Sequence, residues 1–255
     1  MKKVIGLGLL TLALTACGGG GGNSSSSNNE GDKTPVANAE ITGVYTGKTN
    51  QAQNVIGLVD KNNKFWFLYT PPYSNGITGF MTGDLTVSGN TVKAIKGKDF
   101  YFGGSAVYDT SINGTFETKK SLNGTITYTP SNQVTFDTLY DAELNNSVSN
   151  LTTIAGSYIG QSAIVEGIEE ATLTISNTGV ISGKGQSGCT FTGKIAVEEN
   201  APYYNVDLAF GYSPCLLAGQ SVKGVVYYDS SIKSLYAVAE NSTRQNAVLY
   251  LGTKQ

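Results

Sequence analysis

Short runs rich in Val, Ile, Thr, Tyr and Phe dominate the chain from Ile41 onward, and clusters of Gly, Asn, Asp and Ser separate them. Such runs favour strands, and the separating clusters favour tight turns. No window carries a sustained apolar stripe at the helical period, and a short segment near Asp137–Asn146 is the only helix candidate. The pattern predicts an all-β fold made of two small antiparallel domains, each barrel-like or sandwich-like.

A short repeat indicates that this β-structure is built twice. The segment Ile41-Thr-Gly-Val-Tyr-Thr-Gly47 returns as Ile154-Ala-Gly-Ser-Tyr-Ile-Gly160. In a strand the four shared residues lie on one face, where glycines allow a sharp bend and the tyrosine ring packs across them. Two related domains would explain the match, and chance similarity in a chain rich in Gly and Thr is the alternative.

A second match predicts how the two halves differ. The segment Leu85-Thr-Val-Ser88 returns as Leu173-Thr-Ile-Ser176, at a different spacing from the first match. A hairpin inserted into the first half would account for the difference. We expect this hairpin over residues 54–70, with its turn at Lys61–Asn63.

A polar run, Glu143–Asn150, separates the two halves. It places the first domain at residues 41–143 and the second at 151–255, each close to a common domain size. A single continuous sandwich containing all the strands is the alternative arrangement.

The N-terminus has the features of an export signal. Lys2 and Lys3 precede an apolar run that is too short to cross a bilayer, and the run ends in Leu14-Thr-Ala-Cys17. This ending resembles the lipobox of bacterial lipoproteins. The resemblance implies removal of residues 1–16 and acylation of Cys17, with ordinary secretory cleavage as the alternative. Because Gly18 rather than Asp follows the cysteine, the resemblance favours the outer membrane.

Residues 17–40 predict a flexible, lipid-anchored linker. Between Gly18 and Asn29 there is no apolar side chain, so burial cannot offset the entropy lost on ordering. The remaining two cysteines, Cys189 and Cys215, are an even pair in an exported protein, which predicts a disulfide. A redox-active pair is less well supported because the Cys-x-x-Cys spacing is missing.

Composition excludes several function classes. The chain has no His, so it cannot build a His-based catalytic triad, and we expect neither a metal nor a cofactor. Its 17 basic residues are outnumbered by 19 acidic ones, which argues against a nucleic-acid partner. Acidic clusters could supply a glycosidase pair or a weak Ca²⁺ site, although solvated turn charges are the better explanation for them. The clusters are Glu166, Glu169 and Glu170, and Asp137, Asp141 and Glu143.

Aromatic residues are concentrated between Lys64 and Tyr73. A strand here would place Phe65, Phe67 and Tyr69 on one face. Trp66 and Leu68 would lie on the other face, so neither face suits contact with water. We therefore expect the strand to be covered on both sides, by its own core and by a second surface.

The second surface is either the other domain or a ligand. Large aromatic side chains are effective contacts for sugars and protein partners. The candidate ligand contacts are Trp66, Tyr69 and the nearby Tyr73.

The chain as a whole resembles an uncharacterised family of Gram-negative outer-membrane lipoproteins. The resemblance rests on the lipobox, the linker, Gly43-Val-Tyr-Thr-Gly47, and Gly188-Cys-Thr-Phe-Thr-Gly193 followed by Pro214-Cys215. It implies anchoring to the outer membrane through acyl chains and carries over no activity. We expect a non-enzymatic binding module for a glycan or protein. An envelope structural or assembly factor is the second hypothesis, and a carboxylate-based hydrolase is the third.

Overall fold

The computed structural model describes residues 40–74 and 76–255. Cys17, the expected signal peptide and all but the last residue of the expected linker lie outside these residues. These described residues belong to one compact unit. Its described part contains seventeen strands and only a few short helical turns, which confirms the expected all-β class. None of the helices in this part is long and apolar enough to cross a membrane.

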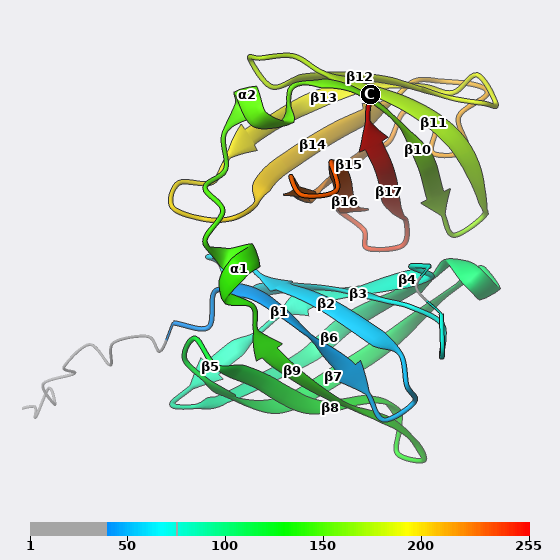
Figure 1. Cartoon of the computed structure of the whole chain (residues 1–255). Helices are drawn as coiled ribbons and strands as arrows, with labels where there is room; N and C mark the ends of the chain where they lie inside the picture. Colours follow the sequence, from blue (N-terminus) through cyan, green and yellow to red (C-terminus); the bar gives the residue numbers. More distant parts are fainter. Residues whose placement is uncertain (1–39, 75) are drawn as a thin grey trace, which may run out of the picture. The chain divides into compact units, whose positions relative to one another are not determined.

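The first eight-stranded barrel, called barrel 1, is a meander closed by antiparallel pairing of its last strand with its first (Figure 1). A ninth strand, β5 (Thr86–Ser88), pairs only with β6. The strands of the closed ring are β1 (Gly43–Thr49), β2 (Asn54–Val59), β3 (Lys64–Tyr69), β4 (Gly79–Asp84), β6 (Thr91–Tyr101), β7 (Ala106–Glu117), β8 (Ser121–Thr129) and β9 (Asn132–Tyr140).

Barrel 2 repeats this topology with eight strands, and β17 closes it by pairing with β10. The two closed barrels exclude the continuous sandwich. The expected disulfide is present and joins Cys189, just before β13, to Cys215 in the loop after β14. The strands of barrel 2 are β10 (Gly156–Ile164), β11 (Gly167–Ile175), β12 (Val180–Gly185), β13 (Thr190–Val197), β14 (Tyr204–Phe210), β15 (Ser221–Asp229), β16 (Ser234–Asn241) and β17 (Ala247–Lys254).

The repeated tyrosine occupies the same place in both barrels. Tyr45 of β1 and Tyr158 of β10 are fully buried. The Tyr45 hydroxyl donates a hydrogen bond of 2.7 Å to the Ile41 carbonyl, four residues earlier. The Tyr158 hydroxyl donates one of 2.5 Å to the Ile154 carbonyl in the same way. The repeat therefore marks the opening strand of each barrel.

The glycines that end the repeat allow each barrel to close. A Cβ at Gly47 would overlap the carbonyl oxygen of Asp137 on β9, and one at Gly160 would overlap that of Leu251 on β17. Glycine at these positions lets the first and last strands approach closely.

A hairpin does form over residues 54–70, but the prediction that it is an insertion is wrong. Strands β2 and β3 do form a hairpin that turns at Lys61–Asn63, but they are the second and third strands of the regular meander. The Leu85–Ser88 segment contains β5, which pairs with one neighbour, whereas Leu173–Ser176 belongs to β11, which pairs with two. The extra element of barrel 1 is thus β5, and the four-residue match does not mark equivalent strands.

The expected helix near Asp137–Asn146 is only partly present. Residues 137–140 continue β9, and the helix is the single turn α1 (Ala142–Asn145). The Asp141 carboxylate begins this turn by accepting a hydrogen bond from the Leu144 N–H. A second single turn, α2 (Leu151–Ile154), precedes β10, and a 3₁₀ turn, η1 (Phe102–Gly104), joins β6 to β7.

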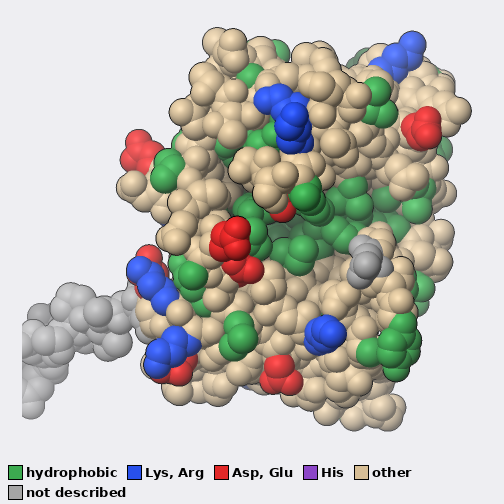
Figure 2. Space-filling model, in the orientation of Figure 1, with side chains coloured by type: hydrophobic (Ala, Val, Ile, Leu, Met, Phe, Trp, Pro, Cys, Tyr) green, Lys and Arg blue, Asp and Glu red, His purple; other side chains and the backbone are tan. Residues whose placement is uncertain are grey.

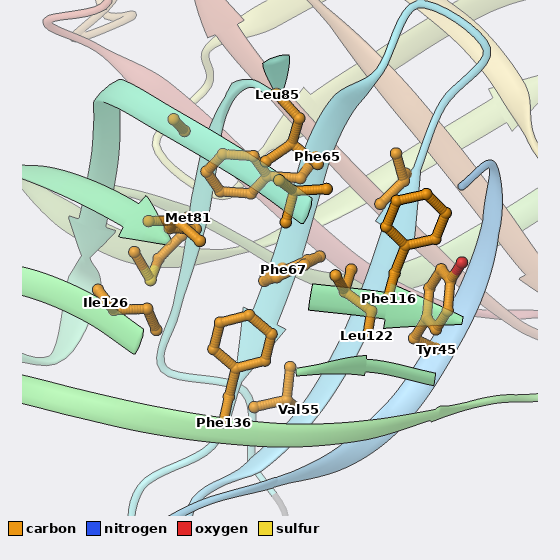
Figure 3. Close-up of a cluster of buried hydrophobic side chains, with 14 of the residues drawn as sticks. Tyr45, Val55, Phe65, Phe67, Met81, Leu85, Phe116, Leu122, Ile126 and Phe136 are labelled. Atoms are coloured by element: carbon orange, nitrogen blue, oxygen red, sulfur yellow. The ribbon is translucent and has the colours of Figure 1, made fainter. Parts of the chain in front are cut away.

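Both faces of β3 are covered, as the sequence predicts. Phe65, Phe67 and Tyr69 belong to the core inside barrel 1, part of which is drawn in Figure 3. Trp66 and Leu68 belong to a separate buried cluster that includes residues of barrel 2. The second surface that covers β3 is therefore the other barrel. The residues of barrel 2 in this cluster include Tyr203, Val225, Val238, Ala247 and Leu249.

Polar contacts accompany this apolar cluster. The Tyr203 hydroxyl accepts a hydrogen bond of 3.1 Å from the Lys61 N–H, and Lys64 Nζ lies 2.6 Å from Glu240 Oε1. Arg244 Nη1 donates to the Lys96 carbonyl at 2.7 Å. Residues of the two barrels thus share a buried apolar cluster and polar contacts that are partly buried or exposed.

Candidate functional site

The largest concave feature of barrel 1 is an open mouth of about 680 Å³ at one end of the ring. This volume lies within the range of small-molecule sites, and eight-stranded barrels are wide enough to hold one small ligand. Deeper in the barrel, a small apolar space is lined by Phe67, Met81, Ile126 and Phe136 (Figure 3). The mouth itself is lined by Gln51, Gln53, Tyr69, Pro71, Pro72, Thr78, Asp99, Tyr101, Tyr108, Asp109, Tyr128, Thr129, Asn132 and Val134.

Asp99 of β6 is the one deeply buried acid of this mouth, with 3% of its surface exposed. Its Oδ1 accepts a hydrogen bond of 2.6 Å from the Tyr69 hydroxyl, and its Oδ2 accepts one of 2.8 Å from the Tyr128 hydroxyl. Within residues 40–74 and 76–255, Asp99 forms no salt bridge, whereas buried acids usually pair with a cation.

The surroundings of Asp99 change its acidity. Burial raises the pKa of its carboxyl, and the hydrogen bonds from Tyr69 and Tyr128 oppose part of that increase. Burial and the neighbouring Asp99 charge also raise the pKa of both tyrosines. Both hydroxyls therefore stay protonated at neutral pH and serve as donors to the carboxyl.

A bulge in β6 aims Asp99 into the barrel. The register of β6 against β7 shifts between Ala94 and Gly97, so one extra residue is accommodated there. Before the bulge, Val92 and Ala94 belong to the barrel core. After it, Tyr101 packs on that core and Asp99 bonds to side chains inside the mouth. Without the extra residue, Asp99 would point away from the mouth.

Gly79 of β4 makes room for the Tyr69 side chain. The two residues are paired in the β3–β4 ladder. A Cβ at Gly79 would overlap the Tyr69 hydroxyl oxygen, so a larger residue would push the phenol away from its position beside Asp99.

Aromatic and amide side chains form the walls of the mouth. The rings of Tyr108 and Tyr128 meet edge to face, with centroids 6.0 Å apart and planes at 84°. Gln53 and Asn132 add uncharged donors and acceptors to the lining. Among the described residues no Lys or Arg lines the mouth, which therefore suits a neutral or cationic group better than an anionic one.

The three candidate contacts named from the sequence lie in three different places. Tyr69 lines the mouth of barrel 1. Trp66, 3% exposed, lies in the cluster shared with barrel 2 and borders an apolar hollow there, together with Ile56 and Leu144. Figure 2 shows hydrophobic side chains gathered in a hollow on this face of the molecule. Tyr73 is 94% exposed in the loop between β3 and β4. The three residues were named together because they are close along the chain, but only Tyr69 lines the mouth.

Sequence reasoning missed most of the mouth. Asp99, Tyr101, Tyr108 and Tyr128 belong to three strands, β6, β7 and β8. The available signal was an acid within the tract Lys98-Asp-Phe-Tyr101, at the end of β6. The bulge conceals this signal because it reverses which residues of β6 face inward.

The acidic clusters named from the sequence lie outside this site. Asp141 caps α1, and Glu169 of β11 accepts a hydrogen bond of 2.7 Å from the Ser187 N–H. None of the six acids lines the mouth of barrel 1. Within the described part of the chain, no group of three or more Cys, Asp or Glu side chains is placed to hold a metal ion.

The sequence matches no family model and no curated protein. Among solved structures, this chain is similar to transferrin binding protein B of serogroup B Neisseria meningitidis. The sequence identity is 10%, the alignment covers 80% of this chain and 50% of that one, and the TM-score is 0.30. A mutant of transferrin binding protein B from Haemophilus parasuis Hp5 gives 11% identity, 80% and 51% coverage, and a TM-score of 0.29.

A protein of unknown function from the DUF3598 family of Nostoc punctiforme gives 10% identity, 84% and 94% coverage, and a TM-score of 0.26. This chain spans about half the length of the two transferrin binding protein B chains. At such low TM-scores, these overlaps say nothing about a shared function.

Proposed function

We propose that this protein is a non-enzymatic binding protein that holds a glycan or a projecting group of a protein in the mouth of barrel 1. The observation that carries the proposal is the open mouth itself, with its aromatic walls and buried Asp99 carboxyl. Sugars present apolar faces that pack on tyrosine rings and hydroxyls that bond to amides and carboxyls. A protein ligand could insert a side chain of similar chemistry.

The architecture of the mouth supports selective binding. Its deep part is lined mainly by apolar side chains together with Thr49 and Gln53, and Asn132 adds a polar group to the mouth. Tyr69 and Tyr128 fix the Asp99 carboxyl from two directions, so a ligand meets an acceptor that is already oriented. Sites with prearranged polar groups lose less conformational entropy on binding.

We also propose that the protein is anchored to the bacterial outer membrane by acyl chains on Cys17. The lipobox-like segment before that cysteine supports this proposal. Metabolic labelling with radioactive palmitate should label the wild type and not Cys17→Ser. Protease treatment of intact cells then distinguishes a surface-exposed protein, which would be cleaved, from one that faces the periplasm.

Binding of the mature protein to an array of glycans and extracellular proteins tests the proposed function. Tyr108, 46% exposed on the mouth, is changed to Ala, and Tyr212, 83% exposed in the loop after β14, serves as the matched control. The expected result is a ligand whose binding falls at least about tenfold in Tyr108→Ala and is unchanged in Tyr212→Ala. Binding that is indifferent to Tyr108→Ala would contradict a site in the mouth and favour an assembly role.

A further inference from the structure

We propose that the group held in the mouth of barrel 1 is an organic ammonium, in particular an alkylated one of the trimethylammonium kind. This inference rests on the proposed function and names the chemistry that the mouth selects. The group would lie near Asp99, against the rings of Tyr101, Tyr108 and Tyr128.

The first argument is the uncompensated acid. Asp99 is almost fully buried, and no basic side chain of the described residues pairs with it or lines the mouth. Removing a carboxylate from water is costly unless a positive charge lies nearby. A ligand that carries a positive charge into the mouth would supply the missing partner. An anionic ligand would instead meet Asp99 with repulsion.

The other acid of the mouth does not provide the same attraction. Asp109 is 85% exposed, and its Oδ1 lies 2.6 Å from Lys98 Nζ. Its charge is therefore offset by its own partner and screened by water. Asp99 is therefore the acid of the mouth that has no salt-bridge partner among the described residues.

The second argument is the aromatic lining. Tyrosine ring faces attract cations, and groups of aromatic rings recognise alkylated ammonium groups in this way. Because the planes of Tyr108 and Tyr128 meet at 84°, these rings form two adjoining walls of a corner. Tyr101, the last residue of β6, adds a third ring to the lining.

The hydrogen bonds around Asp99 favour an alkylated ammonium over a primary amine. Both carboxyl oxygens already accept a tyrosine hydroxyl, at 2.6 Å and 2.8 Å. Each oxygen has one of its two acceptor directions occupied, so fewer directions remain for the N–H groups of a primary amine, whereas the attraction of a cation through space is unaffected. A trimethylammonium group donates no classical hydrogen bonds and loses little water on entering, so it needs only this charge and the ring faces.

A bare metal ion fits the same mouth poorly. Ca²⁺ takes six to eight oxygen ligands, usually with several carboxylates. Asp99 is a single carboxyl whose oxygens are engaged by Tyr69 and Tyr128, and Asp109 is engaged by Lys98.

The test compares choline with 3,3-dimethylbutan-1-ol, which has the same shape but no charge. Titration calorimetry or ligand-observed NMR measures both probes against the mature wild type, Asp99→Asn and Glu117→Gln. Glu117 is an exposed acid of barrel 1 that pairs with Lys120 and does not line the mouth. We expect the wild type and Glu117→Gln to prefer choline by at least about tenfold, and Asp99→Asn to lose that preference. Ethanolamine, a primary amine, should bind more weakly than choline.

A second variant keeps the test decisive if Asp99→Asn unfolds. Tyr108→Leu retains bulk at a half-exposed position but removes the ring, and it should weaken choline binding by about 3- to 30-fold. Equal binding of choline and the neutral alcohol to the wild type overturns the inference, as does the absence of choline binding at millimolar concentration. Either result leaves the proposed function standing if an array ligand still depends on Tyr108. An array ligand that is indifferent to Tyr108→Ala removes the proposed function itself.

Discussion

The Tyr69 hydroxyl donates a hydrogen bond of 2.6 Å to Oδ1 of Asp99, joining the end of β3 to the end of β6 inside barrel 1. The two strands are not adjacent, because β4 pairs with both of them. The bond is possible because the β4 residue opposite Tyr69 is Gly79, which leaves space for the phenol. The mouth of barrel 1 thus depends on three strands that act together.

Asp99 should make the protein less stable as the pH rises. Burial raises its folded pKa above the ordinary value of 3.8, so the folded state holds this proton more tightly than the unfolded state. Between pH 3.8 and the raised folded pKa, the native state binds more protons, and its free energy of unfolding falls with increasing pH. This direction is opposite to that of an Asp in a salt bridge.

Urea unfolding from pH 4 to pH 8 measures this effect as the difference between the wild type and Asp99→Asn. Tyr69 and Tyr128 donate to Asp99, and their raised pKa values keep both hydroxyls protonated throughout this range, whereas Asp109 is the other acid that lines the mouth. Asp109→Asn is the control, because Asp109 is 85% exposed and paired with Lys98. A wild-type free energy that rises with pH relative to Asp99→Asn would contradict the prediction.

Arg244→Ala should cost about 2–4 kcal/mol in the free energy of unfolding. Arg244 donates from Nη1 to the Lys96 carbonyl at 2.7 Å, from Nη2 to the Thr82 carbonyl at 3.0 Å and from Nε to Glu240 at 3.0 Å. Its loss leaves two carbonyls of barrel 1 without these donors. It also weakens the pairing of Glu240, which is only 7% exposed.

Urea unfolding of Arg244→Ala and Arg244→Lys checks this prediction. Lysine should restore little, because one ammonium group cannot reproduce a planar guanidinium that bonds to three acceptors. The control is Lys223→Ala, which removes an exposed pair with Asp207 and should cost less than about 1 kcal/mol. If Arg244→Ala costs no more than Lys223→Ala, the contacts of Arg244 do not stabilise the fold.

Local patterns in the sequence were enough to predict several parts of the fold. Alternation correctly assigned the two faces of β3, and the repeat containing Tyr45 and Tyr158 correctly identified an element shared by the two halves. These features depend on residues that are close in the chain and on the strand period of two. The turn at Lys61–Asn63 was predictable for the same reason.

The mouth of barrel 1 could not be predicted in this way. Its residues come together only when β9 pairs with β1 and β4 pairs with β6, and no local pattern encodes these pairings. The bulge between Ala94 and Gly97 then changes the inward-facing residues of β6, so counting by two places Asp99 on the wrong side. For Trp66 the sequence showed that the side chain is covered but not what covers it, because a buried interface and a ligand surface need the same residue types.

Tyr158→Phe should lower the free energy of unfolding by about 1–2 kcal/mol. The lost hydroxyl is the donor to the Ile154 carbonyl at 2.5 Å, in a fully buried position of barrel 2. Tyr45→Phe should have a similar cost, because its hydroxyl bonds to Ile41 in the same way. Thermal or urea unfolding measures both, with the exposed Tyr73→Phe as the control. Unequal costs for Tyr45 and Tyr158 would show that the two positions are similar only in geometry.

Trp66→Ala should destabilise the protein by about 3–5 kcal/mol while changing ligand binding in the mouth of barrel 1 very little. Trp66 is 3% exposed, lies 6.2 Å from Phe80 between ring centroids, and does not line the mouth. Its removal would leave a void in the cluster that contains residues of both barrels.

Tyr101→Ala is the matched comparison for Trp66→Ala, because it removes an aromatic side chain from the mouth. It should weaken binding of the array ligand or choline more than Trp66→Ala does, and it should cost less stability because Tyr101 is only partly buried. Urea unfolding and titration of both variants give the two quantities independently. A Trp66→Ala variant that kept its stability but lost the ligand would move the binding site from the mouth to the hollow beside Trp66, since a buried packing role cannot produce that combination.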